Sequence, residues 1–279
     1  MNVFLTRSIV ATWLFLASLT AFAQAPPDGK GAPAFPSRPA GAPTGSQFAE
    51  KIQGMAAADR EELVFSEIAR GNIPGFLRSF KEVSVTAAGP DGKSHRAVFE
   101  TLPDYLAVGS NDDFLRIPMT PRTAQRIADR FGCVLPTRKM VDDIYAAAAV
   151  KLTPKPLTKD RESPATFLEH QKLIEQERAG KKTGELTAGH KKDIVVTNRL
   201  QEKPKRVAIY GWHQPGGKPI QPLTIVHGET YADYSHGVRL VCETATVDGH
   251  TMKIADILKD PNLSALLSDE GVIAVPRYR

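Results

Sequence analysis

The chain has 279 residues and a formal net charge of +5, and 24% of its residues are charged. Its lysines and arginines are dispersed rather than clustered, so the charge favours at most adhesion to anionic cell-envelope polymers. Behind an N-terminal leader, about 230 residues remain, which is enough for one large domain or two small ones.

The N-terminus has the features of a secretory signal peptide over residues 1–23. Arg7 is its one charge, residues 9–19 form an apolar stretch, and Ala21-Phe22-Ala23 is a small-x-small cleavage motif. That stretch is too short for a membrane span, and no later one is long enough. Residues 24–46 are built almost wholly from Ala, Pro, Gly and Ser, which predicts a disordered linker. We therefore predict a secreted or periplasmic protein with a single folded domain over residues 47–279.

The first part of this domain predicts a helix followed by a small antiparallel meander. Apolar residues between positions 48 and 70 recur at helical spacing. Residues 80–119 alternate in the manner of strands around the turn signal Gly89-Pro90-Asp91-Gly92. The strands of the meander are expected at 80–88, from 97 onward, at 105–108 and at 114–119.

Residues 120–180 predict three helices. Thr120-Pro121 is a favourable helix start, and so are Pro136-Thr137 and Ser163-Pro164. The first two helices resemble a DNA-reading helix-turn-helix, but the export signal argues against that use, and we expect no nucleic-acid partner. Asp142-Asp143 is expected on the wet face of the second helix. His170, which lies among polar neighbours in the third helix, is expected at the surface.

Residues 190–279 predict a C-terminal sheet. Strands are expected at 193–197, 206–210, 221–226 and 237–243, then a helix within 254–267 and a last strand at 272–276. The whole chain therefore predicts an α+β fold with a mostly antiparallel sheet and packed helices. Lys191, Lys192 and Arg239 could bind a carboxylate or phosphate, although lone basic residues beside strands are more often surface charges.

The densest group of chemically versatile side chains is the run Tyr231-Ala-Asp-Tyr-Ser-His236, with His213 and His227 shortly before it. In an extended strand Ser235 and His236 point to opposite faces, so they do not form a nucleophile–base pair. The residue types of His213, His227, Asp233 and His236 suit zinc, but their spacing matches no compact ligand pattern. We expect no cofactor, with zinc as the alternative.

The two cysteines, Cys133 and Cys242, leave three interpretations open. In an exported protein an even count favours a disulfide, whereas their apolar neighbours also suit two unpaired core thiols. Cys133 also lies just before a predicted helix start, where the helix dipole lowers a thiol pKa. In that third interpretation Cys133 is a nucleophile, His236 is its base, and Asp233 or His227 orients the base.

Three segments carry a resemblance to a known family. Gly132-Cys133-Val-Leu precedes a helix, 188–196 matches a middle strand, and Ser235-His-Gly-Val-Arg-Leu-Val241 matches a strand opened by histidine. In this order the segments resemble NlpC/P60-type cysteine peptidases over residues 130–241, with Gly132 and Val134 where the family has Asp and Ser beside its cysteine. The resemblance implies cleavage of peptide bonds in cell-wall peptidoglycan by Cys133 and His236.

The sequence therefore predicts a cell-envelope hydrolase of the cysteine-peptidase or amidase type. Its catalytic residues would be His236, Cys133, Asp233 and His227, and its substrate contacts Trp212, His213, Tyr231, Tyr234 and Arg239. Trp212 could stack on a sugar ring or anchor the sheet. The alternative is a non-catalytic envelope protein that binds glycan or peptide through the same strip. In either case the partner is a cell-wall polymer or an envelope glycan or peptide.

Overall fold

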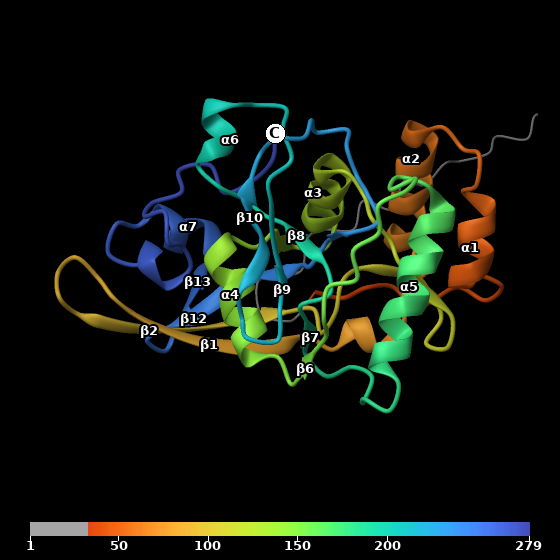
Figure 1. The fold of residues 1–279 in the computed structure, drawn as a ribbon. Helices are drawn as coiled ribbons and strands as arrows, with labels where there is room; N and C mark the ends of the chain where they lie inside the picture. The colour runs from red at the N-terminus through yellow and green to blue at the C-terminus, as the bar shows by residue number, and fades with distance from the viewer. Residues whose placement is uncertain (1–32) are drawn as a thin grey trace, which may run out of the picture. The chain divides into compact units, whose positions relative to one another are not determined.

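Two sheets form the framework of the part of the chain that the computed structural model describes, residues 33–279 (Figure 1). The first sheet contains β1 Lys81–Ala88, β2 Ser94–Thr101, β12 Val241–Val247 and β13 His250–Lys253, with β5 Cys133–Val134 also paired to β12. The second has the order β10 Pro219–Thr224, β9 Ile209–His213, β8 Lys192–Ile194 and β11 His236–Gly237. Two short pairs complete the strands: β3 Ala107–Gly109 with β4 Phe114–Arg116, and β6 Val150–Lys151 with β7 Thr187–Ala188.

All of these ladders are antiparallel except β11–β8 and β6–β7. The helices are α1 Gly45–Lys51, α2 Ala57–Ala69, α3 Pro121–Arg130, α4 Arg138–Ala147, α5 Pro164–Arg178, α6 Arg199–Glu202 and α7 Ile254–Lys259, with 3-10 turns η1 Gly75–Arg78 and η2 Ser264–Leu266. The predicted α+β class with a mostly antiparallel sheet is therefore confirmed. No helix within residues 33–279 is long and apolar enough to cross a membrane.

The three predicted helix starts are confirmed together with their physical cause. The side chains of Thr120, Thr137 and Ser163 each accept a hydrogen bond from the backbone N–H three residues later. This contact satisfies one of the amide groups that the first turn of a helix leaves unpaired. Pro121 and Pro164 occupy the first helical position, where proline loses no hydrogen bond.

Several sequence-based boundaries are wrong. The helix expected at 48–70 is divided into α1 and α2 around Gly54, whose φ is +72°. The single meander over 80–119 does not form, because β2 pairs with β12 from the far end of the chain. β3 and β4 instead make a hairpin of their own. The strand expected at 272–276 is irregular backbone.

The prediction of a disordered linker is also wrong for residues 33–46, the described part of that segment, because these residues pack on the domain. Phe35 is only 8% exposed, and its ring centroid lies 4.3 Å from that of Phe131. The Arg38 guanidinium donates to Asn72 Oδ1 at 2.9 Å and to the Ala42 carbonyl at 2.5 Å. Phe35 and Arg38 make these contacts, and two residues have little effect on the average composition from which disorder was predicted. The predicted signal peptide and residues 24–32 lie outside the described residues.

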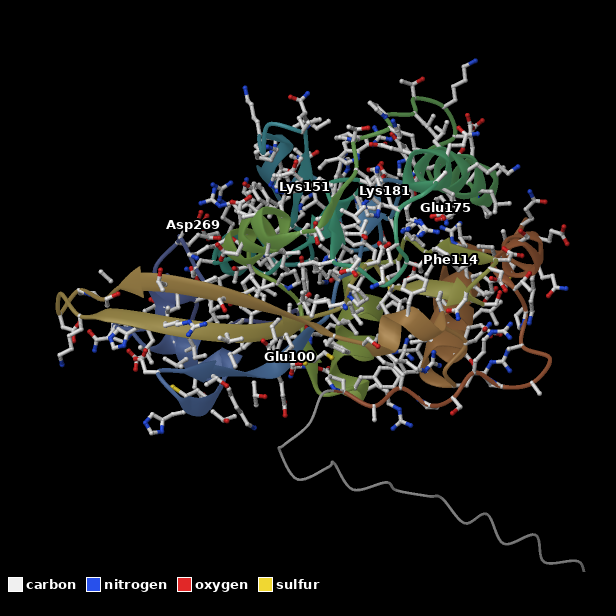
Figure 2. All side chains as sticks on the ribbon, turned by 90° about the horizontal axis from the view of Figure 1, so that it is seen from below. Glu100, Phe114, Lys151, Glu175, Lys181 and Asp269 are labelled. Carbon is white, nitrogen blue, oxygen red and sulfur yellow. The ribbon has the colours of Figure 1, made fainter. Side chains whose placement is uncertain are left out.

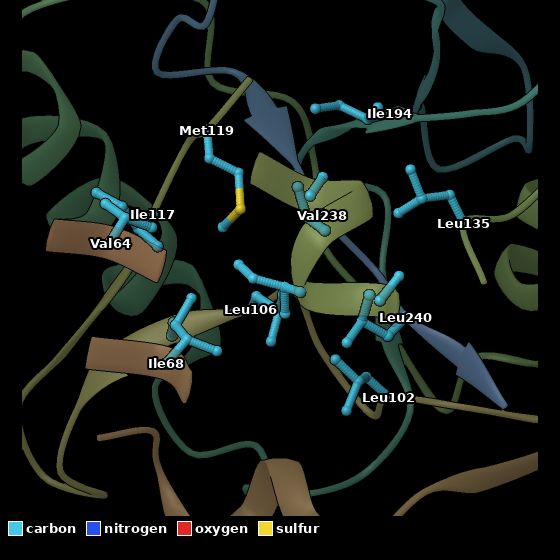
Figure 3. Packing of buried hydrophobic residues seen from close by; sticks show 14 of the residues in the cluster. Val64, Ile68, Leu102, Leu106, Ile117, Met119, Leu135, Ile194, Val238 and Leu240 are labelled. Carbon is cyan, nitrogen blue, oxygen red and sulfur yellow. The ribbon is translucent and has the colours of Figure 1, made fainter. Parts of the chain in front are cut away.

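The largest core cluster fixes the segment that follows β11. Leu102, Leu106, Val238 and Leu240 are fully buried in this cluster (Figure 3). The backbone N–H groups of Leu102 and Leu106 donate to the carbonyls of Leu240 and Val238, at 2.9 and 2.8 Å. Burying side chains of this size stabilises the fold by about 1.5–3 kcal/mol each. The polar run 231–236 is therefore followed directly by a segment that is buried in the core and hydrogen-bonded to it.

Candidate functional site

The strip that the sequence singled out lies inside the protein. Asp233, Tyr234, His236 and Arg239 are each 1% exposed. The Arg239 guanidinium donates to the carbonyls of Leu102 and Thr187, at 2.7 and 2.6 Å, so it holds the backbone rather than a substrate. In this structure Tyr234 and Arg239 are therefore not surface contacts for a ligand.

Four predicted residues do converge, and we call His227, Tyr231, Asp233 and His236 the histidine cluster. The rings of His227 and Tyr231 stack with centroids 4.0 Å apart, and Tyr231 meets His236 edge-on at 5.6 Å. The Tyr231 hydroxyl donates to Asp233 Oδ2 at 2.8 Å, and Arg161 donates to the same oxygen at 2.6 Å. His227 and Tyr231 are half-buried and form the outer side of the cluster.

The charge states within the histidine cluster follow from burial and from Asp233. Burial alone would raise the pKa of Asp233, but His236 and the hydrogen bonds from Ser235 and Tyr231 bring it well below its usual range. Burial lowers the pKa of His236 to about 4, against the opposing attraction of Asp233. Neither ring nitrogen of His236 has a hydrogen-bond partner among the described residues. His236 is therefore neutral near pH 7 and enclosed.

Cationic and imidazole groups beside the histidine cluster are buried, contrary to the surface positions expected for them. Lys191 and Lys192 are 2% and 7% exposed. The Lys191 ammonium donates to the Tyr234 carbonyl at 2.5 Å, and that of Lys192 lies 4.8 Å from the centre of the Trp212 ring. His170 is fully buried, with its ring edge-on to Tyr234 at 4.8 Å. The sequence neighbours of these three residues are polar and predict exposure. Their burial therefore results from tertiary packing.

A backbone reversal in β9 separates Trp212 from the residues on either side of it. Trp212 has φ +57° and Gly211 has φ +105°, both in the left-handed half of conformational space. The reversal interrupts the alternation of side chains, so His213 lies beside Tyr210, with ring centroids 5.9 Å apart. Trp212 instead faces Lys192, and its indole N–H donates to the His190 carbonyl at 3.1 Å. Trp212 thus anchors the sheet and offers no free face to a sugar.

The reversal places His213 at an open cleft, where it meets the carboxylate of Asp142. The sequence predicted Asp142 only as a solvent-exposed residue of its helix. Asp142 on α4 lies with Oδ1 2.8 Å from His213 Nε2. The Tyr210 hydroxyl is 3.0 Å from both oxygens of Asp142. The Tyr145 ring stacks on His213 at 4.4 Å. We call Asp142, Tyr210 and His213 the Asp142 triad.

The cleft has a volume of about 410 Å³ and an open mouth. Its lining consists of Asp142, Tyr145, Ala146, Lys151, Tyr210, His213, Pro215, Gly216, Gly217 and Pro219. The side chain of His213 is 3% exposed, whereas that of Asp142 is 44% exposed. Lys151, labelled in Figure 2, adds a cation to the lining. The accessible reactive group is therefore the carboxylate, held in place by an imidazole and a phenol.

Cys133 and His236, the nucleophile and base of the predicted mechanism, lie in different sheets. Cys133 faces Cys242 across the β5–β12 ladder, and the two residues are 5% and 4% exposed. Burial raises the pKa of the Cys133 thiol well above its usual value. A thiol nucleophile needs the reverse, a lowered pKa and access to substrate. This environment gives no support to a catalytic role for Cys133.

The alternative zinc ligands are divided between two places. His213 belongs to the Asp142 triad, whereas His227, Asp233 and His236 surround Tyr231 in the histidine cluster. Within residues 33–279, no three His, Cys, Asp or Glu side chains are grouped so that they could hold a metal ion.

The backbone reversal gives a direct prediction at Gly211. A Cβ atom there would lie 3.3 Å from a methyl group of Val141 and 3.4 Å from the His213 ring, at a φ that disfavours every residue with a side chain. We expect Gly211→Ala to lower the free energy of unfolding by about 1–3 kcal/mol, measured by urea denaturation. Gly216→Ala is the control, because a Cβ on Gly216 meets no atom within 4 Å. Equal stability of the two variants would contradict the strain assigned to Gly211.

Comparison with protein-family models, with curated proteins and with solved structures found no match to this chain. The resemblance to NlpC/P60-type peptidases therefore stays a prediction. The case for function depends on the residues of the cleft and of the histidine cluster.

Proposed function

We propose that this protein is an exported hydrolase of a cell-envelope polymer and that its reaction takes place in the cleft beside the Asp142 triad. The observation that carries the proposal is the contact of His213 and Tyr210 with one carboxylate, Asp142, at the wall of an open cleft. The signal peptide predicted from the sequence over residues 1–23 supports the export. The peptidoglycan peptide, already suggested by the sequence, is the substrate to test first.

In this proposal Asp142 is the general base. It accepts a proton from a water molecule whose oxygen bonds to the electrophilic carbon of the substrate, while the bond to the leaving nitrogen or oxygen breaks. The leaving group takes up the transferred proton, so the overall reaction adds one water across one bond. Burial and the Asp142 carboxylate raise the pKa of Tyr210 above its usual value, so its hydroxyl stays protonated and continues to donate. His213 and Tyr210 act as positioning residues.

The test compares two adjacent carboxylates. Asp142→Asn keeps the shape of the side chain but removes the base, and we expect it to reduce release of soluble fragments from purified peptidoglycan by at least about 100-fold. Asp143→Asn is the matched control, because Asp143 pairs with Lys139 at 2.8 Å outside the cleft lining. Cys133→Ser should retain activity. Loss of activity in Cys133→Ser with full activity in Asp142→Asn would overturn the proposal in favour of the cysteine mechanism.

Binding without hydrolysis is the second candidate function. The observation that favours it is that Asp142 is the single carboxylate among the described residues of the cleft lining, whereas many glycan-cleaving enzymes use a pair. The two functions differ in their products. A binding protein retains labelled peptidoglycan fragments without shortening them, and Asp142→Asn then changes affinity while no variant changes fragment length.

A further inference from the structure

Cys133 and Cys242 are direct partners across an antiparallel ladder. The β5–β12 register pairs Val134 with Val241 and Cys133 with Cys242. The Glu243 N–H donates to the Gly132 carbonyl at 3.1 Å, so the cysteines occupy a position where the two residues do not hydrogen-bond to each other. At such positions the Cα atoms lie about 4.5 Å apart, and both side chains project from the same face.

This position fits the geometry of a disulfide. Both cysteines are free in the structure. Bridged cysteines have Cα atoms about 4.4–6.8 Å apart, and the spacing typical of this ladder position lies at the lower end of that range. Within residues 33–279 neither thiol has a strong alternative partner: Cys133 Sγ is 3.6 Å from the Phe131 carbonyl, and Cys242 Sγ is 3.9 Å from Glu100 Oε2. Glu100 is labelled on β2 in Figure 2. These are also the only two cysteines of the chain, so a wrong intramolecular pairing cannot compete.

We propose that Cys133 and Cys242 form an intramolecular disulfide as the protein folds in an oxidising compartment. The two thiols lose two protons and two electrons as the Sγ–Sγ bond forms, and a disulfide oxidant such as oxidised glutathione is reduced to two thiols. The bridge closes a loop that contains α4, α5, β8, β9 and β11, and therefore both the Asp142 triad and the histidine cluster. The proposal is independent of the proposed hydrolysis, but the oxidising compartment rests on the export in the proposed function.

Burial determines when the bond forms. It raises the pKa of Cys242 to about 12, and that of Cys133 is also raised, so the folded dithiol contains little reactive thiolate near pH 7. Exchange with an external disulfide is therefore slow in the native state and faster while the chain is still open. The oxidant has to be present during refolding rather than added afterwards.

The experiment refolds the full chain from urea with a mixture of reduced and oxidised glutathione, and in parallel with a reductant. Thiols are then counted in denaturant and the intact mass is measured. We expect the oxidised sample to be a monomer without free thiols, lighter than the reduced sample by two hydrogen atoms. Its melting temperature should be higher by about 10 °C, because the closed loop is long.

Cys133→Ser/Cys242→Ser is the control, and its melting temperature should not respond to the oxidant. Two free thiols after oxidative refolding, a glutathione adduct on each cysteine, or a disulfide-linked dimer would each overturn the proposal. If the double variant does not fold, the comparison of oxidised and reduced wild-type protein still decides between these outcomes.

Discussion

Replacing Arg116 with methionine is expected to lower the free energy of unfolding by about 3–5 kcal/mol. The Arg116 side chain is 1% exposed and makes a double contact with Asp104, at 2.7 and 3.0 Å. It also donates to Glu175 at 2.7 Å and to Gln171 at 3.1 Å, so it joins β4 to α5. Methionine fills a similar volume but leaves Asp104 charged and buried without its main partner.

Two comparisons isolate this cost. Arg277→Met removes an exposed pair with Asp129, and we expect a change of about 1 kcal/mol or less in urea unfolding. Combining Arg116→Met with Asp104→Asn should recover part of the loss, because the double variant no longer buries an unpaired carboxylate. A loss near 1 kcal/mol for Arg116→Met would contradict the assignment of the Arg116–Asp104 pair as a fully desolvated contact.

The second large effect is a pH dependence of stability caused by Lys191. Burial lowers the pKa of Lys191 from its ordinary 10.5 to about 7. Between these two values the unfolded chain binds more protons than the folded one, so the stability of the folded protein rises as the pH increases. From pH 7 to pH 9, Lys191 should therefore increase the free energy of unfolding by about 2 kcal/mol.

Lys191→Met tests this dependence, because methionine carries no proton. We expect the difference in unfolding free energy, variant minus wild type, to decrease by about 2 kcal/mol from pH 7 to pH 9. Lys182→Met is the control and should show no such slope, since the Lys182 side chain is 82% exposed. A difference that is constant with pH would mean that Lys191 stays fully charged in the folded protein.

The elements of the fold could be predicted where the signal is local. Thr120, Thr137 and Ser163 are caps whose chemistry acts within one helical turn, and their helices begin where expected. Partner choice between strands could not be predicted, because β2 alternates in the same way whether its neighbour is β3 or the distant β12. Phe35 shows the same limit, since composition indicated disorder for a segment that one aromatic contact helps to hold.

The candidate site could be predicted only in part. The convergence of His227, Tyr231, Asp233 and His236 follows from their closeness in sequence, and the structure shows it. The link from His213 to Asp142 was missed because it depends on a left-handed tryptophan, and no alternation pattern encodes such a reversal. The burial of Lys191 was missed because a lysine beside a strand is usually solvated, and only the whole core can exclude water from it.

The most direct test of the central claim is a crystal structure of the Asp142→Asn variant with a peptidoglycan disaccharide–peptide. We predict the fragment in the cleft, with the bond to be cleaved beside the side chain at position 142 and within reach of a water molecule held by it. A fragment bound instead against His227 and Tyr231, with the cleft empty, would contradict the account and move the site to the histidine cluster.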